Sequence, residues 1–77
     1  MKLTDANSIS KIIKNRRLAL GLTQETTAEM CGVGKRFFSE LENGKPSLHL
    51  NKVLHCLETL GINLYGIERE KDSEVLK

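Results

Sequence analysis

The stretch GVGKRFFSELENGK, residues 32–45, decides how this chain is interpreted, because its apolar and charged side chains separate at helical spacing. Phe38 and Leu41 are three residues apart and therefore share one face of a helix. The opposite face carries the polar side chains: Lys35, Arg36, Ser39 and Glu40. Glycines bound the segment, which predicts a short helix over residues 34–43 with an inward apolar face and an outward face available to a partner.

The composition predicts one small helical domain. The chain has 77 residues, of which 29% are charged and 4% are aromatic, and it contains no Trp. A β-sandwich would need more β-branched and aromatic residues. A domain of this size has a thin hydrophobic core, so we expect association with a second chain.

Positive charge is concentrated in the first part of the chain. Residues 1–45 contain eight Lys and Arg against five Asp and Glu, a net charge of +3, whereas residues 46–77 contain four against five, a net charge of −1. This imbalance weakly favours a polyanionic partner.

Capping signals and apolar spacing predict four helices in a compact bundle. Residues 8–20 begin at the cap Ser8 and stop at Gly21, and the next helix lies between Thr23 and Gly32. The third helix is that of residues 34–43, and the fourth, residues 48–60, presents one apolar face made of Leu50, Val53, Leu54, Leu57 and Leu60. The first helix has its own periodic set, Ile9, Ile12, Ile13, Arg16 and Leu20. We therefore expect an all-α domain over residues 8–61, after a flexible N-terminus at residues 1–7.

Residues 62–69 have a different pattern from the rest of the chain. Ile62, Leu64 and Gly66 alternate with Asn63, Tyr65 and Ile67, which is typical of a short β-strand. Because one strand has no partner within a helical chain, we expect it to pair with the same strand of a second subunit through Ile62, Leu64, Tyr65 and Ile67. The alternative is an extended tail that lies on the bundle. The charged residues 70–77 predict a disordered tail.

The sequence contains no pattern for metal binding, cofactor binding or catalysis. Cys31 and Cys56 lack CxxC spacing, and together with His49 and His55 they match no usual zinc-ligand pattern, so we expect two reduced, buried cysteines. No nucleophile and base pair, paired carboxylates or phosphate-binding glycine loop is evident. The longest apolar run is too short for a membrane span or a secretory segment. We therefore expect a cytoplasmic, non-enzymatic protein without a cofactor.

The second and third predicted helices together resemble a helix-turn-helix motif. The positions that carry this resemblance are Gln24, Ala28, Gly32, Val33, Phe38 and Leu41. The wider stretch RRLALGLTQETTAEMCGVGKRFFSELENGKPS, residues 16–47, is similar to lambda-repressor-like, Xre-type regulators, and the likeness extends over residues 9–61. Each position alone is a weak signal, whereas the whole set, with LGLTQ and LENGK at the matching separation, is specific.

The resemblance implies that the third helix enters the major groove of DNA. Lys35 and Arg36 would donate to guanine or to phosphate, and Ser39 would reach either a base or a phosphate. Glu40 would accept from a cytosine amino group, although a carboxylate near phosphates also repels. Phe37 would either press on a thymine methyl group or thicken the core. The positions implied at the DNA backbone are Thr23, Gln24, Asn43, Lys45 and Arg16.

Arg17 and Glu42 have a different implied role. In the family that the chain resembles, these positions form a partly buried ion pair between the first and third helices, rather than contacts to DNA. Removing one partner of such a pair would leave the other charge uncompensated.

The resemblance also implies a homodimer, because one such domain contacts too few base pairs to bind specifically. Two recognition helices about 34 Å apart would read an inverted-repeat operator. The stretch GKRFFSELENGKPSLHLNKVLHCLETLGINL, residues 34–64, resembles the HipB-like branch of the family. Members of that branch are antitoxins that bind their own promoter and hold a HipA-like serine/threonine kinase toxin.

Two alternatives stay open. One is a phage-type or restriction–modification control repressor that has the same domain and no toxin partner. The other is a protein-interaction module that has kept the fold and lost DNA binding. The neighbouring reading frames distinguish an antitoxin from a controller, since a kinase-like frame favours the first and a methylase or endonuclease frame the second.

Overall fold

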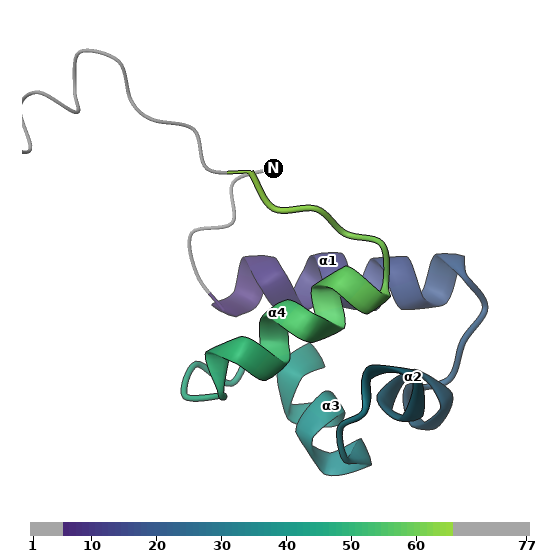
Figure 1. Ribbon diagram of the computed structural model, residues 1–77, viewed down its shortest axis with the longest axis horizontal. Helices are drawn as coiled ribbons and strands as arrows, with labels where there is room; N and C mark the ends of the chain where they lie inside the picture. Colours follow the sequence, from purple (N-terminus) through teal and green to yellow (C-terminus); the bar gives the residue numbers. More distant parts are fainter. Residues whose placement is uncertain (1–5, 66–77) are drawn as a thin grey trace, which may run out of the picture.

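The structure, a computed structural model, describes residues 6–65. Within these residues four helices follow one another: α1 (Ala6–Ala19), α2 (Gln24–Cys31), α3 (Lys35–Glu42) and α4 (Leu50–Thr59). Figure 1 shows α1 and α4 in the upper part of the domain and α2 and α3 below them. The predicted all-α, four-helix architecture is confirmed.

The helix α1 begins earlier than the sequence predicts. Ala6 and Asn7 are already helical, so Ser8 lies inside the helix and is not its cap, and the predicted boundary between a flexible N-terminus and the domain is wrong by two residues. Ala is the best helix former, and the Ser10 hydroxyl donates to the Asn7 carbonyl (2.9 Å) within the first turns. Gly44 packs against the same place, since a Cβ added to it would collide with Asn7 Oδ1.

The helices α2 and α3 begin and end where the sequence predicts. The Thr23 hydroxyl caps α2 by accepting from the Thr26 N–H (3.0 Å). Gly32 ends α2 in the left-handed region (φ 71°), which a residue with a Cβ adopts only with strain. The Val33 N–H then donates to the Ala28 carbonyl (3.0 Å), a bond that closes the last turn of α2. The connection to α3 is therefore only three residues long, and it fixes the angle between the two helices.

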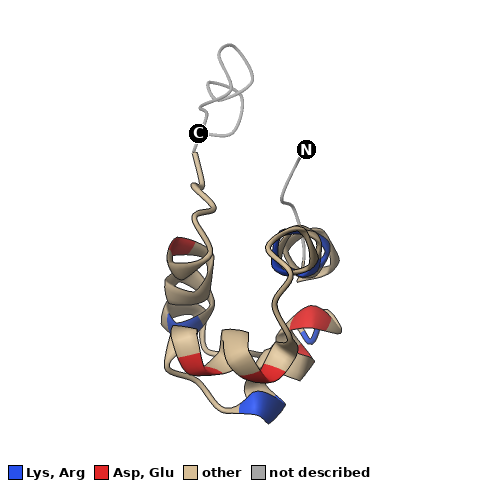
Figure 2. Cartoon of the chain, turned by 90° about the vertical axis from the view of Figure 1, so that its right-hand side faces the viewer, with Lys and Arg blue, Asp and Glu red and all other residues tan. Residues whose placement is uncertain are grey.

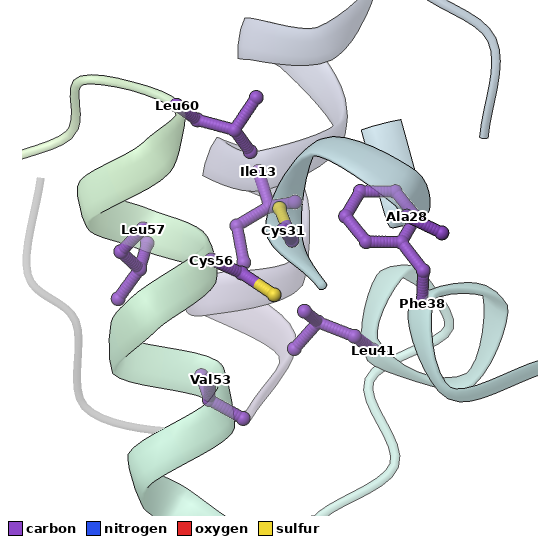
Figure 3. Packing of buried hydrophobic residues seen from close by; sticks show 9 residues of the cluster. All are labelled: Ile13, Ala28, Cys31, Phe38, Leu41, Val53, Cys56, Leu57 and Leu60. Atoms are coloured by element: carbon purple, nitrogen blue, oxygen red, sulfur yellow. The ribbon is translucent and has the colours of Figure 1, made fainter. Parts of the chain in front are cut away.

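Side chains from all four helices form one hydrophobic core, shown in Figure 3. Its buried members are Ile13, Ala28, Cys31, Phe38, Leu41, Val53, Cys56, Leu57 and Leu60. Phe38 is fully buried and fills the space between α2 and α3, where the small side chain of Ala28 leaves room for its ring. Both cysteines lie in this core as free thiols, as the sequence predicts. Burial raises the pKa of Cys56 to about 12, so this thiol is protonated at neutral pH.

The residues of the apolar face predicted for α4 differ in their exposure. Val53, Leu57 and Leu60 are buried, but Leu50 and Leu54 are 64% and 42% exposed. Cys56 takes the inward position, because the buried stripe runs through residues 53, 56, 57 and 60 at the spacing of one helix face. Leu20, which was expected inward in the first helix, is exposed as well, since α1 ends at Ala19.

The segment after α4 is only partly described. Residues 62–65 are in neither a helix nor a strand, and the remainder of the predicted strand, including Ile67, lies outside the described residues, as do residues 1–5 and 70–77. Ile62 is half-buried against the core, and its N–H donates to the Leu57 carbonyl (2.9 Å) at the end of α4. The intersubunit strand stays a prediction. In residues 6–65, no helix is long and apolar enough to span a membrane.

Candidate nucleic-acid interface

The helix α3 separates its side chains into two faces. Phe38 and Leu41 point into the core, while Lys35 and Arg36 in the first turn are exposed. The start of α3 is the lowest part of the molecule in Figure 2, where the ribbon is blue for Lys and Arg. Burial of Phe38 and Leu41 fixes the rotation of this short helix about its axis, so the two cations are held outward by core packing and not by contacts of their own.

A cluster of three charges follows on the same face, and we call Arg36, Glu40 and Lys45 the Glu40 cluster. Arg36 Nε lies 3.6 Å from Glu40 Oε2, one helical turn away, and Lys45 Nζ lies 3.3 Å from the same oxygen. The side chains of Arg36, Lys45 and Glu40 are 91%, 47% and 29% exposed. Ion pairs at such exposed positions contribute little to stability. The sequence suggested the three residues as separate DNA contacts, and the structure brings them together around one carboxylate.

A second ionic network lies behind α3. Arg17 Nε is 2.5 Å from Glu42 Oε2, and the side chains of Arg17 and Glu42 are only 10% and 2% exposed. Arg17 Nη2 donates to the other carboxylate oxygen (3.0 Å), and Nη1 donates to the Leu22 carbonyl (2.7 Å). The hydrogen bond to Glu42 raises the pKa of Arg17, and desolvation by burial opposes part of that shift. The bidentate pair therefore joins α1 to the end of α3, and each of the three guanidinium nitrogens donates one hydrogen bond.

Gln24 is part of the same network. Its Nε2 donates to Glu42 Oε1 (2.9 Å), the oxygen that also accepts from Arg17 Nη2. Because a carboxylate only accepts hydrogen bonds, the amide must turn its NH₂ group toward Glu42, and one N–H of that group is left to donate elsewhere. Gln24 is half-buried at the first position of α2. The family resemblance implies that Gln24 bridges the DNA backbone and the recognition helix, and the packing of α2 against α3 makes Glu42 its partner on that helix.

Other predicted backbone contacts lie at the ends of α2 and α3. The Thr23 hydroxyl donates to Thr26 Oγ1 (3.0 Å) and accepts from the Thr26 N–H, so both of its hydrogen-bonding directions are used within α2. Asn43 is exposed at the C-cap of α3, and Ser39 is half-buried on the side of that helix. The Thr23 hydroxyl can donate to a phosphate only by giving up its bond to Thr26 Oγ1.

Phe37 is half-buried and packs against the hydrophobic core. Of its two predicted roles, this position favours an addition to the core over a contact with a thymine methyl group. Lys52 of α4 lies over its ring, with Nζ 5.7 Å from the ring centre, a distance typical of a cation–π contact. Lys52 is not among the residues that the sequence predicts for the interface. The spacing of Lys52 within α4 predicts only that its side chain is exposed. Its contact with Phe37 forms because the fold brings this part of α4 next to α3.

Arg16 lies apart from the other predicted contacts. Its Nε donates to the Leu60 carbonyl at the end of α4 (2.9 Å), and a Cβ added to Gly61 would lie 3.3 Å from Nη2. This junction of α1 with α4 is in the upper part of Figure 1, away from the start of α3. The position gives Arg16 a structural role in closing the bundle and argues against the predicted phosphate contact. The reason is the rotation of α1, which turns Arg17 toward α3 and the neighbouring Arg16 toward α4.

A groove lies beside α4 on another side of the molecule. It is lined by Leu54, Leu57, Glu58, Ile62, Asn63, Leu64 and Tyr65 and has a volume of about 380 Å³. Leu54, Leu64 and Tyr65 are exposed large side chains, and Leu50 extends the apolar surface along α4. Metal ligands are not clustered anywhere in residues 6–65, where no three His, Cys, Asp or Glu side chains converge.

Comparison with known proteins gives a family and a fold. The Helix-turn-helix family matches residues 13–67 of the chain. A relative in Sinorhizobium fredii (strain NBRC 101917 / NGR234), named as the uncharacterized HTH-type transcriptional regulator y4mF, is 37% identical over 60 residues, which cover 78% of this chain and 75% of that protein.

Solved structures of the same fold include chains that are 20% identical to this one. A chain of the HipB-O4 20mer complex has a TM-score of 0.79, with 91% of this chain and 99% of that chain covered. A chain of the HipA-HipB-O2-O3 complex and a structure named MDT Protein each have a TM-score of 0.80, with the same shares covered. At this identity the likeness shows a shared fold.

Proposed function

The chain belongs to the Xre-like helix-turn-helix family of DNA-binding transcriptional regulators, and from that premise we propose that it is the repressor and antitoxin of a HipBA-like module. In this proposal a homodimer binds an inverted-repeat operator through the outward face of α3. The same protein neutralises a HipA-like serine/threonine kinase toxin.

The observation that carries the DNA-binding part is the division of α3 into two faces. Phe38 and Leu41 close the core, and the first turn holds Lys35 and Arg36 in solvent. A recognition helix needs this arrangement, because the side chains of its first turns must reach base edges in the major groove. Gln24 adds a donor at the start of α2, with an N–H left over from its bond to Glu42.

The homodimer is supported by the apolar surface beside α4. Leu50, Leu54, Leu64 and Tyr65 are exposed there and adjoin the groove between α4 and residues 62–65. A small domain gains stability by covering such a surface. The predicted strand of residues 62–69 begins within it, so strand pairing and helix packing would use one continuous interface about a two-fold axis.

The toxin partner is supported by likeness of fold. The chain shares its fold with chains of the HipB-O4 20mer complex and of the HipA-HipB-O2-O3 complex. The second candidate function is a repressor without a toxin, and it is favoured by the relative at 37% identity, which is named only as a transcriptional regulator. Both candidates require the same DNA interface, and they differ only in the protein partner.

Enrichment of duplexes from a random-sequence pool tests the DNA-binding part. We expect the full-length protein to select an inverted repeat and to bind it with an affinity that falls steeply as salt rises, because neutralised phosphates release counterions. A pool without any enriched sequence, or a flat salt titration, would contradict the proposal.

Purification of the protein after expression with its native gene neighbours tests the partner. We expect a kinase-like chain to co-purify in a fixed ratio. If only the homodimer is recovered and its operator binding is intact, the toxin-free repressor is the correct function. Sedimentation of the purified protein then measures the dimer, and a monomer at micromolar concentration would contradict the proposed interface.

A further inference from the structure

The Glu40 cluster places a negative charge in the middle of the surface that is proposed to meet DNA. Glu40 Oε2 lies 3.6 Å from Arg36 Nε and 3.3 Å from Lys45 Nζ. Glu40 is the least exposed of the three side chains, so the two longer cationic side chains converge on a carboxylate that is comparatively fixed. Two of the cations on this face are therefore paired within the protein, while Lys35 makes no ion pair among the described residues.

Contact with DNA changes the partners of this cluster. A phosphate that approaches Arg36 or Lys45 competes with Glu40 for the N–H donors of that cation, and it is repelled by the Glu40 charge at the same time. Exposed ion pairs are weak, so the exchange is feasible on any duplex. The repulsion, however, is present on every duplex, because it does not depend on the base sequence.

A matching base sequence can offset this repulsion. A carboxylate in the major groove accepts a hydrogen bond from the amino group of cytosine, and an arginine donates to the O6 and N7 atoms of guanine. Arg36 and Glu40 are one helical turn apart on the same face, so they can contact neighbouring base pairs. Only such a sequence gives Glu40 a favourable partner in place of the two cations.

On these grounds we propose that Glu40 determines discrimination against non-operator DNA. It holds Arg36 and Lys45 away from phosphates in general and releases them where a cytosine amino group takes their place. This inference rests on the proposed function as a DNA-binding repressor, and it adds a role for one residue that opposes binding to most sequences.

The test compares the wild-type protein with Glu40→Gln and with a matched control, Glu29→Gln. Glu29 is exposed on α2 and makes no ion pair among the described residues, so its substitution changes the net charge equally without touching the cluster. The probes are the duplex that the wild-type protein enriches from a random pool and a scrambled duplex of the same composition. Fluorescence anisotropy gives both affinities over a range of salt concentrations.

We expect Glu40→Gln to bind the scrambled duplex about three- to tenfold more tightly, as two weak ion pairs are released. Affinity for the enriched duplex should stay the same or fall, so the specificity ratio decreases. The salt dependence on scrambled DNA should steepen by about one for each cation that gains a phosphate. A repeated enrichment with Glu40→Gln should lose a cytosine that the wild-type protein selects, because glutamine prefers adenine.

Glu29→Gln controls for the loss of one negative charge, and we expect it to raise both affinities equally. A second control removes Arg36, and in an Arg36→Ala background the effect of Glu40→Gln should shrink. Equal specificity ratios for wild type, Glu40→Gln and Glu29→Gln would overturn the inference while leaving the repressor proposal intact. Parallel weakening on both duplexes would overturn it too, since Glu40 would then only support the helix. If the wild-type protein binds no duplex, both proposals fail.

Discussion

Glu40 and Glu42 are two residues apart in α3 and have opposite surroundings. Glu42 is buried against Arg17, and its two oxygens accept three hydrogen bonds from Arg17 and Gln24. Glu40 faces solvent, with Arg36 and Lys45 at the longer distances of 3.6 and 3.3 Å. A step of two residues turns a helix by about 200°, so neighbouring glutamates of the same helix serve the interior and the exterior.

Burial, and not residue type, decides whether an ion pair of α3 stabilises the fold or can exchange its partner. Desolvation makes the Arg17–Glu42 pair costly to break, because each charge depends on the other once water is excluded. Solvent screens the Glu40 cluster, so its pairs are exchangeable and suit a surface that changes partners. We therefore expect substitutions in the Arg17–Glu42 pair to change mainly stability, and substitutions in the Glu40 cluster to change mainly DNA binding.

The largest effect is expected from Arg17→Met, which removes one partner of the buried pair. We expect the free energy of unfolding to fall by about 3–5 kcal/mol, because Glu42 is left buried without its cation. Urea unfolding followed by circular dichroism measures this change. If the single variant does not fold, Arg17→Met/Glu42→Leu provides the test, since removing both charges should restore most of the lost stability. A single variant as stable as the wild type would contradict the structural role of the pair.

Lys35→Ala should act on DNA binding and not on the fold. We expect operator affinity to weaken by about 1–3 kcal/mol with a relaxed base preference, while stability changes by less than about 0.5 kcal/mol. Anisotropy with the enriched duplex and urea unfolding measure the two quantities. Lys11→Ala is the matched control, because Lys11 is an exposed cation on α1. Equal losses of affinity in the two variants would assign the effect to net charge and not to α3.

Arg16→Ala should show the reverse behaviour on a smaller scale. Loss of the hydrogen bond to the Leu60 carbonyl should lower the free energy of unfolding by about 1 kcal/mol, with operator affinity unchanged once the protein is folded. The same two measurements apply. A drop in affinity without a drop in stability would restore the phosphate contact that the sequence predicts for Arg16.

The smallest effect on stability is expected from Glu40→Gln. Its ion pairs are exposed, so the free energy of unfolding should change by less than about 0.5 kcal/mol. Urea midpoints of the wild type and the variant, measured side by side, determine this difference. A loss near that of Arg17→Met would mean that the Glu40 cluster supports the fold, and the contrast between the two glutamates would disappear.

The helix-turn-helix core could be predicted in detail because its signals are local. Thr23, Gly32 and Gly34 set the limits of α2 and α3 by capping and turn chemistry. Phe38 and Leu41 indicate the inward face of α3 by spacing alone, and both are buried. Local rules of this kind need no knowledge of neighbouring elements.

The predictions that differ from the structure concern residues whose surroundings depend on another part of the fold. Spacing placed Leu54 on one apolar face with the buried residues of α4, but Leu54 is exposed. The resemblance implied Arg16 as a contact to the DNA backbone, but Arg16 donates to the Leu60 carbonyl at the end of α4. Asn7 was assigned to a flexible lead-in, whereas it is helical and lies against Gly44. Arg16 and Asn7 each contact a residue that is far away in the chain, Leu60 and Gly44 respectively.

By itself, the sequence determined that four short helices form, where the two central ones begin and end, and which side chains of the third helix are apolar. The tertiary structure alone decided that Glu42 is the acceptor for Gln24, that Lys52 covers Phe37, and that Arg16 donates to the end of α4. The physical reason is the distance along the chain over which each interaction acts. Caps and periodicity act within a turn or two of helix, whereas the partner of a polar side chain is fixed by the packing of whole helices.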